Sequence, residues 1–137
     1  MISTDSGNTS SLEVSSPSGW VLPEALQYLI DEGDHDAIAA ILCKFKSDTR
    51  SRLQLLRGAV ENANAREIRS QAHAINGNAR LVGAETIVSV CRQLEIDAEN
   101  GEAAALIRLV ELIDERFCAV CQSVDQAIAQ AELDRSH

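Results

Sequence analysis

The stretch Ser70-Gln-Ala-His-Ala-Ile-Asn-Gly-Asn-Ala-Arg-Leu-Val-Gly-Ala84 decides how this sequence is interpreted. Apolar residues in and just before it recur at three- and four-residue steps, which predicts an amphipathic helix; they are Ile68, Ala72, Ile75, Ala79 and Val82. At about 100° per residue, His73 lies roughly 140° from the middle of this apolar stripe. We therefore expect its imidazole to point into solvent.

The surroundings of His73 on the same helix face are unusual. Gly77 follows one turn later, although glycine costs about 1 kcal/mol in a helix relative to alanine. Its presence indicates that something bulky has to approach the imidazole. Arg66, Arg69 and Arg80 fall within about 40° of His73 on the helical wheel. An exposed imidazole with free space and cations beside it suits a transferred phosphoryl group.

Composition and length favour one cytoplasmic helical domain. The chain has 137 residues, of which 45% are hydrophobic but only 3% aromatic, as is typical of helix bundles. It shows no apolar run of membrane-spanning length and no signal-peptide pattern at its start. In such a chain the four cysteines are expected to be reduced thiols. Residues 1–19, rich in Ser, Thr, Gly and Asn, predict a disordered tail that Trp20 anchors to the body.

The charge is unevenly distributed along the chain. The net charge is −9, which argues against a nucleic-acid binder, because such a protein needs cations to displace counterions from phosphates. Residues 1–43 carry −7, residues 44–80 carry +5 and residues 81–137 carry −7. The segment around His73 is thus a basic island in an acidic protein, which favours an anionic group or an acidic partner surface there.

The remaining patterns predict an all-α protein: an antiparallel up-down-up-down four-helix bundle with a short extra N-terminal helix, occupying residues 20–137. Sequential helices with short connections pack as antiparallel neighbours. Caps and turns at Asp34, Asn64, Gly83 and Asn100-Gly101 separate the elements. The expected helices cover residues 23–31, 36–62, 64–82, 84 to the turn at 100–101, and 102–133.

Other residues that often carry chemistry have simpler interpretations. His35 lies in an acidic turn and His137 is terminal, so both are expected to be solvated surface residues. Cys118 and Cys121 form a Cys-x-x-Cys pair that would suit zinc or redox chemistry. They lie within a helical pattern that offers no second ligand pair, which favours packing instead. Cys43 and Cys91 are predicted to be small buried hydrophobes.

The segments His73-Ala-Ile-Asn-Gly-Asn-Ala-Arg-Leu-Val-Gly-Ala84 and Cys91-Arg-Gln-Leu-Glu95 resemble the signature of the histidine-containing phosphotransfer (HPt) domain family. That signature has a histidine followed by a hydrophobe, a lysine, a glycine and small polar residues, then a Leu-Gly-Ala helix junction and a Cys-x-x-Leu-Glu helix. The resemblance covers residues 36–130 and includes apolar residues on the preceding helix, namely Phe45, Leu53 and Leu56.

The resemblance implies a phosphorelay intermediate without kinase activity of its own. His73 would accept a phosphoryl group from a receiver-domain aspartate or a kinase and pass it to another receiver aspartate. The partners would be receiver domains of response regulators or hybrid histidine kinases, which would supply Mg²⁺, and the chain would need no cofactor, nucleic acid or membrane. It has no nucleotide-binding Gly-x-x-x-x-Gly-Lys-Ser/Thr loop. The expected partner-binding residues are Arg66, Arg69, Ala74, Gly77, Arg80, Leu22 and Leu26.

One position departs from the family pattern. Asn76 stands where most members have the lysine that helps to neutralise the phosphoryl group. Arg80 or Arg69 is expected to take that role, because arginine is always charged and chelates phosphate oxygens. The predicted support of the phosphoryl site is thus Asn76, Gly77, Arg69 and Arg80. Asn76 also keeps an alternative open: a degenerate docking module that binds a receiver or kinase without carrying phosphate.

Overall fold

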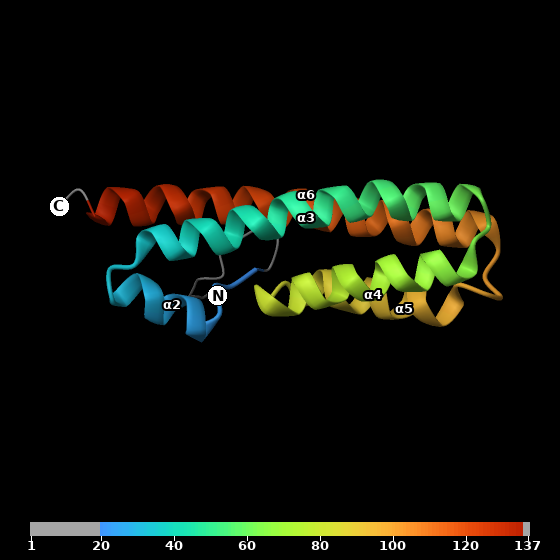
Figure 1. Cartoon of the computed structure of the whole chain (residues 1–137), viewed down its shortest axis with the longest axis horizontal. Coiled ribbons are helices and arrows are strands. Elements are labelled where there is room, and N and C mark those ends of the chain that lie inside the picture. Colours follow the sequence, from blue (N-terminus) through green and yellow to red (C-terminus); the bar gives the residue numbers. More distant parts are fainter. Residues whose placement is uncertain (1–19, 136–137) are drawn as a thin grey trace, which may run out of the picture.

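The structure, a computed structural model, describes residues 20–135 and is entirely helical there apart from short connections (Figure 1). These residues form five helices, each within two residues of its predicted bounds: α2 Glu24–Asp31, α3 His35–Glu61, α4 Ala65–Leu81, α5 Glu85–Asp97 and α6 Ala103–Arg135. The predicted tail at residues 1–19 and His137 lie outside the described residues. No helix in residues 20–135 carries an apolar stretch that could cross a lipid bilayer.

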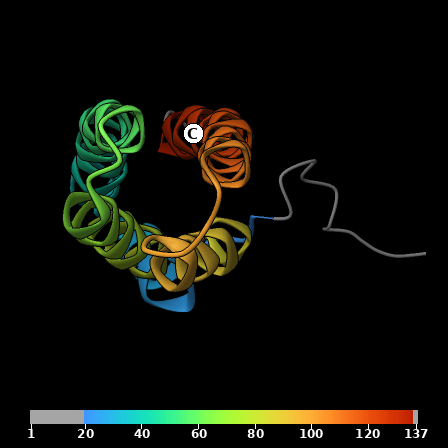
Figure 2. The same cartoon turned by 90° about the vertical axis from the view of Figure 1, so that its right-hand side faces the viewer.

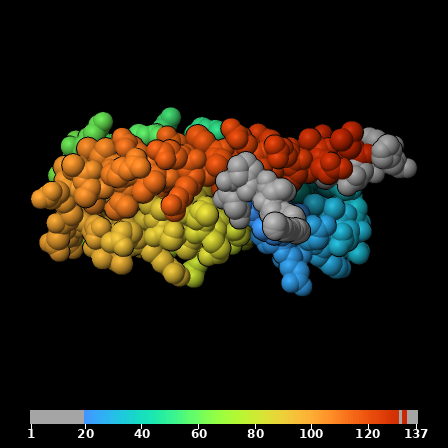
Figure 3. Space-filling view, turned by 180° about the vertical axis from the view of Figure 1, so that it is seen from behind, coloured from blue at the N-terminus to red at the C-terminus, as the bar shows by residue number. Residues whose placement is uncertain are grey.

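The four long helices pack side by side around a common core. Seen from the end, α3, α4, α5 and α6 follow one another around a ring, with α3 next to α6 (Figure 2). The short helix α2 packs against α3 and continues the line of α4 and α5 beyond their junction (Figures 1 and 3). The predicted four-helix bundle with an extra N-terminal helix is confirmed.

Local capping explains where the helices begin and end. The Asp34 side chain accepts a hydrogen bond from Ala37 N at 3.2 Å and begins α3. Asn64 does the same for Glu67 N at 3.1 Å and begins α4. Gly83 follows α4 with φ +74°, a left-handed conformation that glycine adopts without steric cost. Only three residues therefore separate α4 from α5, which makes them antiparallel neighbours.

The core is mostly aliphatic, as expected from a composition with only 3% aromatic residues. The five apolar residues that the spacing placed on one side of α4 and its C-cap are all buried, and apolar residues of the other helices pack against them. At about 25 cal/mol per Å² of buried apolar surface, this shared core is the main source of stability. The largest fully buried side chains are Ile38, Leu42, Leu53, Leu56, Ile68, Ile75, Val82, Ile87, Leu94, Ile113, Val120 and Val124.

The segment before α2 is fastened to the α4–α5 junction. Trp20 is only 6% exposed, and its Nε1 donates a hydrogen bond to Val82 O at 2.7 Å. This bond occupies a carbonyl at the end of α4 that has no partner within the helix. Pro23 packs closely on the junction, because a Cβ built on Gly83 would lie 2.8 Å from Pro23 Cγ. Trp20 thus anchors the N-terminal segment to the bundle, as predicted.

Candidate functional site

The candidate site is the outer face of α4 around His73. The His73 side chain is 80% exposed, so the expectation that it points into solvent is confirmed. One turn later Gly77 is also exposed, and a Cβ built there would meet no heavy atom within 4 Å. Nothing in the bundle therefore requires a glycine at this position. The space beside the imidazole is open to an approaching molecule.

The imidazole is held from one side by a residue of α5. His73 Nδ1 lies 3.3 Å from Glu95 Oε1. The other oxygen, Glu95 Oε2, accepts a hydrogen bond from Asn76 Nδ2 at 3.4 Å. A carboxylate accepts but does not donate, so this contact favours the tautomer with hydrogen on Nδ1 and a lone pair on Nε2. Glu95 belongs to the Cys91-Arg-Gln-Leu-Glu95 motif, but the motif alone does not indicate this contact.

Asn76 lies beneath the site rather than beside the imidazole. It is 7% exposed and turned toward the α4–α5 seam, and its Oδ1 is buried without a hydrogen-bond partner in the described residues. From there its amide orients the Glu95 carboxylate. An asparagine is too short and too buried at this position to replace the surface charge of a lysine. Any positive charge for a phosphoryl group has to come from elsewhere.

The three arginines that the helical wheel placed around His73 are not equivalent. Arg69 pairs with Glu99 of α5, with NH1 2.9 Å from Oε1. Arg66 and Arg80 are exposed and make no ion pair within residues 20–135. Surface pairs of this kind contribute at most about 1 kcal/mol, so Arg69 can exchange its partner at small cost. Together the three arginines place positive charge on the outer face of α4.

A polar network on the other side of α4 fixes it against α3. Asp48 Oδ2 accepts hydrogen bonds from Asn78 Nδ2 at 2.7 Å and from Arg52 Nε at 2.8 Å. These bonds lower the pKa of the Asp48 carboxyl below its usual range. Arg52 also donates from NH1 to Gln71 Oε1 at 3.2 Å. Beside the network lies an open pocket of about 340 Å³ between α3 and α4 that reaches the exposed Leu81.

The structure corrects one of the two predicted docking leucines of the N-terminal segment. Leu26 is 6% exposed and belongs to the core, and Leu22 is half-buried against it. Leu26 points inward because the apolar stripe of the short helix α2 covers the end of the bundle. Leu22 precedes α2 and is only partly buried, so its docking role stays a prediction. The exposed apolar residues here are Val21, at 68%, and Tyr28, at 62%.

The cysteines divide into two buried and two exposed thiols. Cys91 and Cys121 are buried, and burial raises their pKa to about 12 and about 11. Cys43 and Cys118 are exposed, contrary to the packing predicted for both. The apolar stripe passes through Leu42 in α3 and through Phe117 and Cys121 in α6 instead. In the described residues no three His, Cys, Asp or Glu side chains gather in a group suited to a metal ion.

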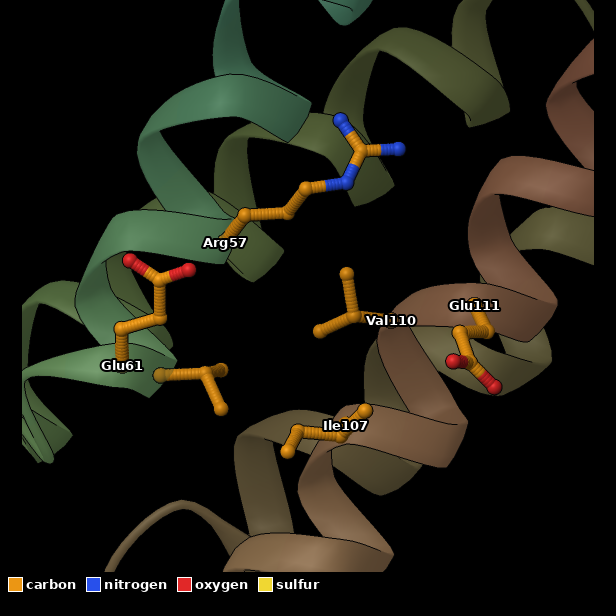
Figure 4. A pocket seen from close by; sticks show the side chains of 6 residues that line it. Arg57, Glu61, Ile107, Val110 and Glu111 are labelled. Carbon is orange, nitrogen blue, oxygen red and sulfur yellow. The ribbon is translucent and has the colours of Figure 1, made fainter.

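A second pocket lies away from these side chains. It has a volume of about 220 Å³ and is lined only by α3 and α6, with Ile107 and Val110 facing Arg57 and Glu61 across it (Figure 4). The imidazole of His73 instead contacts α5, on the opposite side of the ring in Figure 2. This pocket is therefore not part of the histidine site.

Within the described residues, the chain is an antiparallel four-helix bundle whose second long helix displays the His73 imidazole to solvent. The Hpt domain family matches residues 40–132, and the chain belongs to that family. It is a phosphotransfer protein of the phosphorelay type.

Among solved structures, histidine-containing phosphotransfer protein B (HptB) from Pseudomonas aeruginosa PAO1 is similar, with a TM-score of 0.71 and 26% identity. The match covers 85% of this chain and 98% of that one. Among curated proteins none matches the chain.

Proposed function

We propose that His73 is the phosphoryl acceptor of this phosphotransfer protein, taking the group from the aspartate of one receiver domain, or from a kinase, and passing it to the aspartate of another. The observation that carries the proposal is the imidazole itself. It is 80% exposed, contacts Glu95 through Nδ1, and has open space above Gly77.

In the proposed reaction the Nε2 lone pair of His73 attacks the phosphorus of the receiver's acyl phosphate. The N–P bond forms while the P–O bond breaks, and its electron pair leaves with the aspartate carboxylate. No proton has to leave Nε2, because in this tautomer the hydrogen is on Nδ1. The phosphorylated ring gains positive charge, which Glu95 stabilises 3.3 Å away. Transfer to the next receiver is the reverse of these steps.

The chain's contribution is mainly positioning and charge, as for phosphoryl transfer in general. The partner receiver would bring Mg²⁺ and its acidic pocket. The basic side chains Arg66, Arg69 and Arg80 would steer that pocket toward His73. Gly77 and Ala74, on the side of α4 turned toward α3, would allow close approach of the receiver loops.

Asn76 supports a second candidate, a docking module that binds receivers without carrying phosphate. Its amide is buried under the site and provides no charge. This candidate predicts that a receiver binds the protein with unchanged affinity after His73→Ala, and that no phosphohistidine forms.

The test uses the full chain and the receiver domains encoded in the same genome, each labelled at its aspartate with radioactive acetyl phosphate. At least one receiver is expected to transfer label to the wild type and none to His73→Gln. His35→Gln is the matched control and should be labelled like the wild type. Equal labelling of His73→Gln would remove His73 from the reaction. Receiver binding without any transfer would favour the docking module.

A further inference from the structure

A cation on α5, Arg92, faces the same seam as Glu95. It is exposed, and its side chain makes no ion pair or hydrogen bond within residues 20–135. Arg69 and Arg80, which were expected to supply the missing charge, both lie on the helix that carries His73. Arg92 belongs to the next helix, so the wheel of α4 did not include it.

The pairing of α4 with α5 places Arg92 opposite Asn76. Arg69 and Glu99 are in contact and lie fifteen residues on either side of Ala84. His73 and Glu95 are in contact and lie eleven residues on either side of it. The two helices are thus paired symmetrically about their junction. Asn76 and Arg92 each lie eight residues from Ala84, so the same register places them opposite each other.

The direction of the Arg92 side chain follows from the α5 wheel. At about 100° per residue, Arg92 lies about 20° from Glu99 and about 60° from Glu95. Both of these glutamates reach across to α4. Arg92 therefore points along the outer edge of the seam, toward α4. Asn76, which lies beneath that edge, is buried and carries no charge.

The other cations are less well placed. Arg69 would first have to leave Glu99, although at small cost. Arg66 and Arg80 are each seven residues from His73, about 10.5 Å along the helix axis. Arg92 is three residues from Glu95, about 4.5 Å along α5, and Glu95 itself touches the imidazole.

We propose that Arg92 binds the phosphoryl group on His73 from the neighbouring helix and supplies the positive charge that Asn76 does not. This inference rests on His73 being the phosphoryl acceptor. Guanidinium N–H groups donate to two phosphate oxygens at once. Such bonds reduce the negative charge on the phosphoryl oxygens. That charge assists cleavage of the N–P bond, so the phosphohistidine is hydrolysed more slowly.

The experiment measures the lifetime of phosphohistidine without any partner protein. The full chain is loaded with phosphoramidate, a small-molecule phosphoryl donor, which is then removed. The decay is followed by ³¹P NMR, with His73→Gln as the blank for other histidines. Arg92→Gln is expected to shorten the half-life about twofold to fivefold, the range for an exposed charge pair. Arg92→Lys should retain most of the wild-type lifetime, and added salt should reduce the difference.

Arg108→Gln is the matched control, because it removes one exposed arginine from α6 and should leave the lifetime unchanged. Equal lifetimes for wild type and Arg92→Gln, or equal losses in Arg108→Gln and Arg92→Gln, would overturn the role of Arg92. Failure of wild-type His73 to load would overturn it as well. A shortened lifetime in Arg92→Gln without exchange with any receiver would support Arg92 while contradicting the proposed relay.

Discussion

Replacing Gly77 with alanine is expected to stabilise the fold and impair phosphoryl transfer at the same time. Gly77 is in the interior of α4, where glycine costs about 1 kcal/mol relative to alanine. The added methyl group would meet no heavy atom within 4 Å, so no steric term offsets that gain. We expect the free energy of unfolding to rise by about 1 kcal/mol, or about 3–5 °C in Tm for a chain of this size.

The same methyl group would stand in the path of a receiver approaching His73. Overpacking of a close interface costs about 1–3 kcal/mol. Transfer from a phosphorylated receiver is therefore expected to slow about tenfold in Gly77→Ala, since about 1.4 kcal/mol corresponds to a factor of ten. Gly77→Leu should slow it further while remaining folded, because leucine is also a good helix former.

Gly58 provides a matched control within α3. It is also helical, and a Cβ built there meets nothing within 4 Å. Gly58→Ala should raise Tm by a similar amount and leave transfer unchanged. Thermal unfolding followed by circular dichroism gives the first quantity, and the rate of label transfer gives the second. Unchanged transfer in Gly77→Leu would refute the argument that this glycine exists for clearance.

Three further outcomes follow from buried or paired groups. Trp20→Phe is expected to lower the free energy of unfolding by about 1–3 kcal/mol in denaturant titration, because the buried Val82 carbonyl loses its donor. Ellman's reagent at pH 8 should modify two of the four thiols rapidly; Cys91 and Cys121, with pKa raised to about 12 and about 11, should react only on unfolding. Because hydrogen bonds lower the pKa of Asp48 from 3.8, its stabilising contribution is present above that value and lost as the pH falls through the folded pKa. Asp48→Asn should therefore be less stable than wild type at pH 7, with a difference that shrinks in unfolding experiments as the pH is lowered below 3.8.

The fold was accessible from the sequence because its signals are local. The three- and four-residue spacing identified the buried stripe of α4, and the caps at Asp34 and Asn64 set the starts of two helices. A glycine in the left-handed conformation at Gly83 fixed the short junction. Each of these features depends on residues within one or two turns, so no knowledge of tertiary packing was needed.

The site was only partly accessible, because a wheel shows which residues share a face but not what lies opposite. The helical wheel of α4 correctly predicted that His73 is exposed and that Arg69 lies on the same side of the helix. It did not show that Glu99 would engage Arg69, or that Asn76 would be covered by α5. Leu26 was misjudged for a related reason, since the apolar face of a short helix looks the same whether it covers a core or meets a partner.

The three-residue junction between α4 and α5 determines the chemistry of the site as well as its shape. Because the helices turn back so tightly, pairs across the seam are equally spaced from Ala84, which brings Glu95 to the imidazole of His73. Trp20 and Pro23 pack on this junction from outside and hold it in place. A longer or looser connection would allow the helices to slide by a residue, and the carboxylate would then no longer face Nδ1. The tautomer of His73 that the Glu95 contact favours therefore depends on the packing of a turn about ten residues away in the chain.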